Sequence, residues 1–150
     1  MKIDWKFKSF SDLSINELYG ILNIRQRVFI IEQNCNYLDA DNLDQFSHHL
    51  TASHKGKIIA YLRVVEKGIT CPHISLGRIL VDRNYRGLGI GKKIMTKALK
   101  KINKQTTIVM FAQLYLVKFY EGFEFIKEGE EFLEDNIPHV KMIRNGLHKS

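Results

Sequence analysis

The sequence has few of the residues that mark cross-linked, segmented or membrane-spanning proteins. Its 150 residues include two cysteines, Cys35 and Cys71, which are too few and too scattered for a disulfide framework or a zinc site. With two prolines and no Ser/Gly-rich linker or repeat, no domain boundary is evident, so residues 1–150 are expected to form one domain. No run approaches the ~20 apolar residues of a membrane span, and the N-terminus lacks the apolar core of a signal peptide. We therefore expect a soluble cytoplasmic protein with reduced thiols.

Positive charge exceeds negative charge. The chain has 23 Lys and Arg residues against 16 Asp and Glu, which gives a formal net charge of +7. This excess favours anionic partners such as phosphates, nucleotides or nucleic acid. However, the lysines from Lys92 to Lys104 mostly occupy the outer face of one amphipathic helix, without interleaved aromatic residues or a known reading motif. A solvated helix face is therefore favoured over a nucleic-acid surface.

Hydrophobic spacing predicts an α/β order of elements. Alternating apolar residues predict a strand over residues 3–7, and the capping box of Ser14 and Glu17 starts a helix near Ile15. Two strands around a tight turn are predicted within residues 48–66. Further strands are predicted at 74–82, 106–113 and 139–144, and further helices at 90–102 and 114–122. Because a tight turn joins the early strands, we expect a mixed, largely antiparallel sheet flanked by helices.

Three glycines, Gly87, Gly89 and Gly91, separate the strand predicted at 74–82 from the next helix. Each glycine costs backbone entropy, so the cluster indicates that the backbone approaches another molecule closely. Free N–H groups and the dipole at a helix start attract anions, and a missing Cβ lets a phosphate reach them. The spacing fits neither the P-loop, G-x-x-x-x-G-K-[ST], nor the dinucleotide fingerprint, G-x-G-x-x-G. The remaining pattern, starting at Arg86, is R-x-x-G-x-G.

This pattern resembles the acyl-CoA loop of the GNAT superfamily of N-acetyltransferases. The stretch ISLGRILVDRNYRGLGIGKKIMTKAL resembles the family's fourth strand, pyrophosphate loop and third helix, and FAQLYLVKFYEGFEF resembles its fifth strand and next helix. The stretches LYGILNIRQRVFIIEQNCNYLDADNLD, HHL, AYLRVV and EDNIPHVKM resemble, in order, segments of the ElaA-like branch. The resemblance implies a single-domain GNAT fold whose sheet is splayed between its fourth and fifth strands.

Two positions depart from the family's pattern. Glu124 stands where F-Y-x-x-x-G-F has its glycine, which leaves open whether the turn after the helix uses Gly122 instead. Asn136 replaces the glycine of EDGIPH. That change is mild, because asparagine tolerates a left-handed backbone.

The resemblance also implies a binding site for acetyl-CoA as co-substrate, without a metal ion. Main-chain amides of the glycine loop would hold the pyrophosphate, and the preceding strand would line the pantetheine arm and polarise the thioester carbonyl with an N–H group. Gln113 either contacts CoA or steadies Tyr120. The implied CoA-binding residues are Ile79, Leu80, Val81, Arg86, Gly87, Leu88, Gly89, Ile90, Gly91 and Gln113.

Tyr120 matches the tyrosine that serves many GNAT enzymes as general acid. A phenol with a pKa of ~10 stays protonated at neutral pH and can donate its proton to a thiolate. The alternative is a core aromatic residue, because Phe119 and Phe123 flank it. The implied reaction is direct acetyl transfer to the primary amine of a small molecule or peptide.

The general base is expected in the segment from Glu32 to His49. Carboxylates there could attract a cationic amine and a histidine could remove its proton, so Glu32 and His49 are the selected candidates. Asp39 and Asp44 can equally belong to a solvated acidic loop. No spacing in this segment matches a standard metal cage.

Two further charged residues have open roles. Arg25 lies with Leu18, Leu22 and Phe29 on the apolar stripe predicted for the first helix, so a carboxylate of the acidic segment is expected to pair with it. His139, in IPHVKM, can be structural, with its ring bonded to a carbonyl group.

Two alternative functions and the oligomeric state stay open. An acyl-CoA-binding sensor or interaction module could keep the fold without turnover. The stretch LNIRQRVFIIEQ also faintly resembles autoinducer synthases, which use longer acyl chains. The acceptor amine is not specified, because acceptor pockets are built from the least regular segments. Neither a monomer nor a homodimer is excluded.

Overall fold

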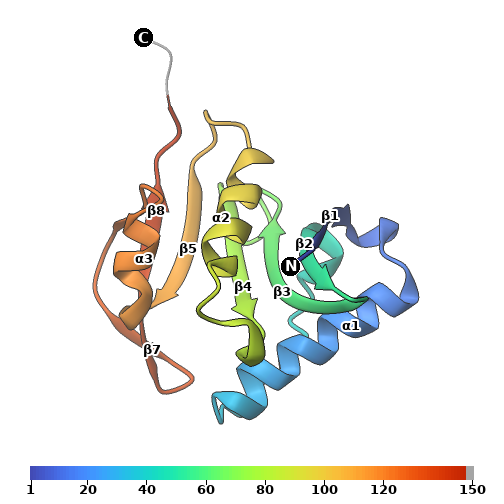
Figure 1. The fold of residues 1–150 in the computed structure, drawn as a ribbon. Coiled ribbons are helices and arrows are strands. Elements are labelled where there is room, and N and C mark those ends of the chain that lie inside the picture. Colours follow the sequence, from blue (N-terminus) through green and yellow to red (C-terminus); the bar gives the residue numbers. More distant parts are fainter. Residues whose placement is uncertain (148–150) are drawn as a thin grey trace.

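One mixed β-sheet extends through the chain from near its N-terminus to near its C-terminus (Figure 1). The computed structural model describes residues 1–147. The strands are β1 (Asp4–Ser9), β2 (Ser47–His54), β3 (Lys57–Val65), β4 (Ile74–Val81), β5 (Ile108–Gln113), β6 (Ile126–Lys127), β7 (Phe132–Glu134) and β8 (Ile137–Arg144). The helices are α1 (Ile15–Arg25), α2 (Ile90–Lys100) and α3 (Val117–Glu121). Each predicted element is present to within a few residues, whereas β6 and β7 were not predicted.

The strand order is β1-β2-β3-β4-β5-β8-β6, with β7 paired to β8. All paired strands are antiparallel except β4 and β5, which are parallel. The expectation of a mixed, largely antiparallel sheet is therefore confirmed. The parallel pair joins the two parts of the sheet, and α2 supplies the crossover that parallel strands require.

The helices cover both faces of the sheet. Helix α1 packs on Tyr61 of β3, whereas the cluster that contains α2 and α3 packs on Leu62, the next residue of the same strand. Successive side chains of a strand point to opposite faces, so α1 lies on one face and α2 and α3 lie on the other. On α2, the predicted apolar face is buried: Ile90, Ile94, Ala98 and the following Ile102.

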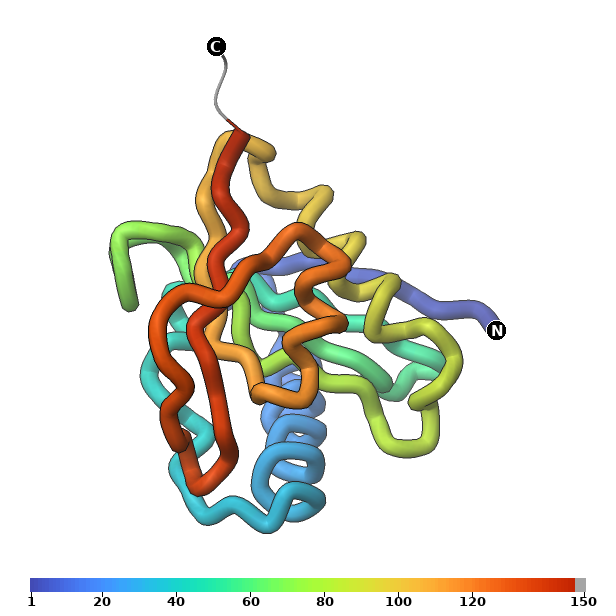
Figure 2. The backbone as a smooth tube through the Cα atoms, turned by 90° about the vertical axis from the view of Figure 1, so that its left-hand side faces the viewer, coloured from blue at the N-terminus to red at the C-terminus, as the bar shows by residue number. Residues whose placement is uncertain are grey.

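Helix α1 starts where the sequence predicts. The Ser14 hydroxyl accepts a hydrogen bond from the Glu17 N–H at 3.0 Å, and Glu17 Oε1 accepts one from the Ser14 N–H at 2.8 Å, so the capping box is formed. After Arg25 the chain continues as a π-helical stretch, Gln26–Glu32. The two segments follow each other directly, so Glu32 ends a continuous helical rod (Figure 2).

The buried side of α1 is rotated from the predicted stripe. Arg25 is fully buried, as the stripe implies, but Leu18, Leu22 and Phe29 are only half-buried. The apolar residues that are buried on this helical rod are Ile21, Ile24 and Val28. The isoleucines fit this side because they reach Tyr61 and Leu80 on the sheet.

The parallel strands β4 and β5 separate along their length. They pair from Ile74 opposite Ile108 to Leu76 opposite Met110, and the register has no pairs beyond these. The cause lies in β4, where the register with β3 shifts after Gly77 and Arg78 has a φ of 51°. A bulge bends its strand, so the carboxyl ends of β4 and β5 diverge and open a gap. The predicted splay between the fourth and fifth strands is confirmed.

Both departures from the family pattern adopt the conformation that glycine would have. Glu124 has a φ of 71° and Asn136 a φ of 62°, both in the left-handed region. Gly122 instead has a φ of −63°, so it does not replace the missing glycine in the turn after α3. Both turns therefore have the backbone geometry that a glycine would give, and the left-handed conformation of Glu124 costs conformational free energy.

Among residues 1–147, no helix combines the length and the hydrophobicity needed to cross a lipid bilayer. The same residues hold no group of three or more His, Cys, Asp and Glu side chains that could bind a metal ion.

Candidate active site

Two cavities meet in the gap between β4 and β5. The first, of about 530 Å³, lies against the glycine loop and the start of α2, and we call it the donor cavity. The second, of about 380 Å³, lies between β4, β5, β7 and β8, and we call it the acceptor cavity. Residues that line both are Phe29, Gln33, Ile79, Gln113, Leu116 and Tyr120. The two cavities therefore adjoin at this shared set of residues.

The donor cavity ends at main-chain N–H groups that have no internal partner. Gly87 and Gly89 both have a φ of 79°, and Gly89 caps the N-terminus of α2. The first helical bond runs from the Lys93 N–H to the Gly89 carbonyl, and within residues 1–147 the N–H groups of residues 87–92 donate to no main-chain acceptor outside their own helix. A Cβ at Gly91 would lie at ordinary contact distance, 3.7 Å from the Phe119 ring. The loop is shaped to receive an anion.

All but one of the residues expected to bind CoA line the donor cavity. They are Ile79, Leu80, Val81, Arg86, Gly87, Gly89, Ile90, Gly91 and Gln113. Leu88 does not line it, and the residue is 55% exposed.

Arg86 connects the glycine loop to the end of the helical rod. Its Nη1 lies 2.7 Å from Glu32 Oε2, and its Nε donates to the Val81 carbonyl at 3.0 Å. Glu32, one of the two expected base candidates, therefore lines the donor cavity and is paired with a guanidinium. This position is next to the anion loop rather than in the acceptor cavity.

Tyr120 lies where the two cavities meet. It is 5% exposed and packs against Phe119 and Phe125. Its ring is therefore part of the core, as the alternative interpretation of Tyr120 expects. Its hydroxyl has no hydrogen-bond partner among residues 1–147, and burial raises the pKa of Tyr120 above its ordinary value. A raised pKa keeps the phenol protonated at neutral pH, as proton donation requires.

A largely buried network of ion pairs lies beside the acceptor cavity on the β3–β4 side, and its residues Asp41, Arg63 and Arg78 line the cavity. It joins Arg25, Arg63 and Arg78 to Asp39, Asp41 and Asp44, with N–O distances from 2.7 to 3.3 Å. The expected carboxylate partner of Arg25 is thus confirmed. The solvated-loop interpretation of Asp39 and Asp44 is wrong, because both side chains are buried and paired with arginines. Sequence alone does not reveal Arg63 and Arg78 as their partners.

The arginines set the charge state of this network. Burial by itself raises the pKa of Asp44, but hydrogen bonds and the charges of Arg25 and Arg63 outweigh it, and the net pKa is lowered. The same balance, with Arg63 and Arg78, lowers the pKa of Asp41. These two carboxylates are therefore ionised at neutral pH and offset part of the arginine charge beside the cavity.

His49 does not lie in either cavity. Its Nδ1 is 2.6 Å from the Tyr61 hydroxyl, its Nε2 is 2.9 Å from the Asp44 carbonyl, and the side chain is 1% exposed. Burial lowers the pKa of His49, so the ring is kept neutral beside the charge network. The expectation that His49 is the general base is therefore corrected, since no substrate can reach either ring nitrogen.

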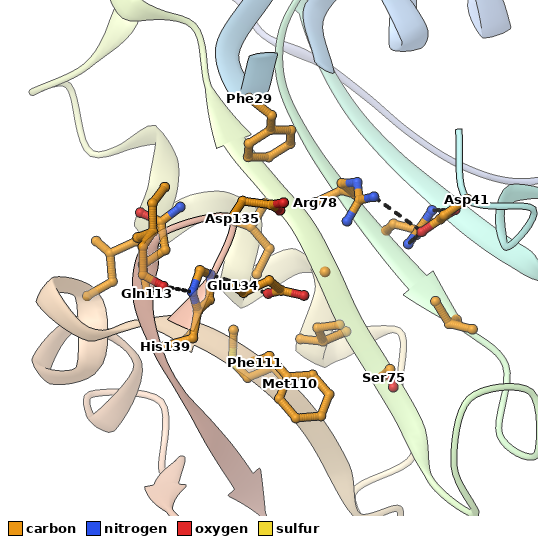
Figure 3. A pocket seen from close by; sticks show the side chains of 18 of the residues that line it. Phe29, Asp41, Ser75, Arg78, Met110, Phe111, Gln113, Glu134, Asp135 and His139 are labelled. Carbon is orange, nitrogen blue, oxygen red and sulfur yellow. Dashed lines mark hydrogen bonds and ion pairs between the residues drawn. The ribbon is translucent and has the colours of Figure 1, made fainter. Parts of the chain in front are cut away.

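Two residues that the sequence did not single out as a pair lie on the other wall of the acceptor cavity. Figure 3 shows His139 on β8 and Glu134 on β7 pointing toward each other, with Gln113 of β5 beside them. Nε2 of His139 is 3.5 Å from Glu134 Oε2, and Nδ1 is 2.7 Å from the Ile137 carbonyl. The expected carbonyl bond of His139 is confirmed, but the ring also faces the cavity.

A sheet splayed at a parallel strand pair, with a glycine loop and a helix N-terminus at the opening, is typical of CoA-dependent acyltransferases. The family model of the acetyltransferase (GNAT) domain matches residues 19–145. The chain belongs to the GNAT acetyltransferase family, and its relatives place it with the ElaA-like proteins.

Those relatives and their structures resemble the chain over nearly its whole length. UPF0039 protein sll0451 of Synechocystis sp. is 35% identical over 95% of this chain and 96% of its own. Protein ElaA of Escherichia coli is 33% identical over the same shares, and its crystal structure superposes with a TM-score of 0.90, covering 96% of this chain and all of that one. An acyl-CoA N-acyltransferase from Pseudomonas aeruginosa, 35% identical, has a TM-score of 0.92 and covers 95% of this chain and 99% of its own.

Proposed function

We propose that the protein transfers an acetyl group from acetyl-CoA to the primary amine of a small molecule or peptide, with Tyr120 as general acid. The observation that carries this proposal is the position of Tyr120, whose side chain lines both the donor and the acceptor cavity. A group that donates a proton to the leaving thiolate must reach the place where donor and acceptor meet. Tyr120 is there, protonated and without a competing hydrogen-bond partner in the described chain.

The donor cavity fits a CoA thioester. Its anion loop supplies unpartnered N–H groups at residues 87–92, which suit a diphosphate. The strand ending at Val81 diverges from β5, so main-chain groups of Ile79 and Leu80 are free of that neighbour and can bind the pantetheine amides. Bound acetyl-CoA would supply an activated acyl carbon to the amine.

In the proposed reaction the chain's own groups act at three points. An N–H of β4 near Ile79 donates to the thioester oxygen, where negative charge develops. The amine forms the new C–N bond as the C–S bond breaks, and Tyr120 gives its proton to the sulfur. The shared side chains Phe29 and Leu116 exclude water from the place of transfer.

A donor with a longer acyl chain is the second candidate. Beyond Ile79, the acceptor cavity continues along apolar side chains of Val65, Leu76 and Met110. A cavity closed just beyond the thioester would have excluded such donors, and this one, of about 380 Å³, is not closed there. Comparing acetyl-, butyryl- and hexanoyl-CoA with one acceptor distinguishes the two candidates.

Calorimetry with acetyl-CoA and a thiol-release assay over a panel of primary amines test the proposal together. Binding accompanied by amine-dependent thiol release supports it. Binding without release over the whole panel would favour a sensor module, and absence of binding would end the proposal.

A further inference from the structure

His139 lines the acceptor cavity, and one of its ring nitrogens is hydrogen-bonded to the main chain. Its side chain is 8% exposed and its ring stacks on Phe132 at 6.0 Å. A carbonyl oxygen can only accept a hydrogen bond, so the Ile137 carbonyl, 2.7 Å from Nδ1, requires the proton to be on Nδ1. In the neutral ring Nε2 is then the basic nitrogen, and His139 lines the acceptor cavity.

Glu134 supplies a negative charge at the same nitrogen. Its Oε2 lies 3.5 Å from Nε2, and the carboxylate has no Lys or Arg partner in the part of the chain that the structure describes. The two acceptor atoms together suit an ammonium group, which has several N–H donors. The same carboxylate stabilises the imidazolium once His139 has taken a proton.

The other ionisable groups around His139 lie on the strands that pair with β8, on β8 itself and in the lining of the acceptor cavity. On the strands that pair with β8, the ionisable residues are Lys127 of β6 and Glu134 of β7, and β5 has none. On β8 itself, Lys141 pairs with Glu128 and Arg144 with Glu124. The remaining ionisable residues that line the cavity are Cys35, Tyr37, Asp41, Arg63, Arg78, Tyr120 and Asp135.

Among these groups the unpaired charge is negative. The carboxylates of the buried network cancel Arg63 and Arg78, whereas Asp135 and Glu134 have no arginine or lysine partner among residues 1–147. A cationic amine is therefore attracted to the same side of the cavity on which His139 lies.

The rival base candidates lack such a position. Glu32 is paired with Arg86 at the donor cavity, and both ring nitrogens of His49 are bonded inside the protein. Of the histidines in residues 1–147, His139 is the one that lines the acceptor cavity. His139 and Tyr120, the proposed acid, line the same cavity.

We propose that His139 is the general base of the reaction and that Glu134 positions the ammonium group and the protonated ring. Nε2 takes one proton from the acceptor's ammonium group and later releases it to solvent. The freed amine forms the C–N bond as the C–S bond breaks, and sulfur takes the Tyr120 proton. The nitrogen's second proton replaces the one lost by Tyr120, so one proton is released per acyl group transferred. This inference rests on the proposed function.

The test is the pH dependence of kcat/KM for wild type, His139→Gln and His73→Gln, which is a matched change at an exposed histidine outside both cavities. Wild type and His73→Gln should lose activity on acidification, because a protonated base no longer accepts the proton of the amine. His139→Gln should lower kcat/KM at neutral pH roughly 10²- to 10⁴-fold, and its activity should keep rising with pH as more amine becomes neutral. Acetyl-CoA affinity should stay unchanged.

Glu134→Gln covers the case in which His139→Gln fails to fold, since the Glu134 side chain is 56% exposed. It should raise KM for the amine more than it changes kcat, because the ammonium group loses its carboxylate partner. Nitrogen NMR of the wild type should show the proton of the neutral His139 ring on Nδ1.

Two results would contradict the role of His139 as general base while leaving acetyl transfer intact. One is a loss of kcat/KM on acidification in His139→Gln that equals the loss in wild type. The other is a neutral His139 ring protonated on Nε2. Absence of thiol release from wild type with every amine would instead remove the proposed function, and this inference with it.

Discussion

Arg86 Nη1 lies 2.7 Å from Glu32 Oε2, so the end of the first helical rod is bound to the glycine loop. The pair places a carboxylate beside the N–H groups that we propose bind a diphosphate. A bound diphosphate would compete with Glu32 for the guanidinium, since Arg86 cannot give its full charge to both.

Glu32→Gln is therefore expected to tighten acetyl-CoA binding. Removing the charge of an exposed ion pair should change affinity roughly two- to fivefold, and high salt should reduce the difference. Calorimetry at low and high ionic strength measures it, with Glu66→Gln, an exposed residue outside both cavities, as the control. If Glu32→Gln instead lowers kcat at unchanged affinity, Glu32 is the base.

Tyr120→Phe is expected to lower kcat roughly 10²- to 10⁴-fold, the usual contribution of a general acid. Acetyl-CoA affinity should stay close to wild type, because the ring that packs on Phe119 and Phe125 is retained. Tyr19→Phe, at a 73% exposed position on α1, is the matched control. Turnover equal to wild type would show that another group protonates the thiolate.

Gly89→Val is expected to abolish acetyl-CoA binding. Gly89 has a φ of 79°, and a left-handed β-branched residue costs about 1–2 kcal/mol while placing a side chain over the anion loop. Gly68→Val is the matched control, because Gly68 has a φ of 87° and lies far from the loop in sequence, outside both cavities. Both variants should lose similar stability in urea, but only Gly89→Val should lose binding. Equal binding by both would contradict the assignment of the loop.

Asp44→Asn is expected to lower the free energy of unfolding by about 3–5 kcal/mol, because it leaves the buried Arg25 and Arg63 without a full counter-charge. The lowered pKa of Asp44 also sets a pH dependence. Its contribution is present above the unfolded pKa of ~3.9 and is lost as pH falls through the lower folded value. Urea unfolding from pH 7 to acid should thus show a shallower loss in Asp44→Asn than in wild type. Asp12→Asn, at an exposed position, should have the same free energy of unfolding as wild type at each pH. A similar decrease in the free energy of unfolding in Asp12→Asn and Asp44→Asn would exclude the network as the cause.

Local signals in the sequence predicted the fold well. The Ser14–Glu17 capping box placed the start of α1, and the apolar spacing from Ile90 to Ile102 identified the buried face of α2. Both signals depend on residues three or four apart, whose interaction needs no distant partner. The buried side of α1 was less well predicted, because Ile21 and Ile24 are buried by Tyr61 and Leu80 of the sheet.

The sequence by itself determined the glycine loop, the order of elements and the family, since these follow from neighbouring residues and ordered motifs. Only the tertiary structure decided the acceptor cavity. Asp39 and Asp44 are buried because Arg25, Arg63 and Arg78 come to them from three other elements. His139 faces the cavity because β8 pairs with β5 in one register and β7 brings Glu134 to its ring. Such contacts join residues far apart in the chain, and no local pattern encodes their register.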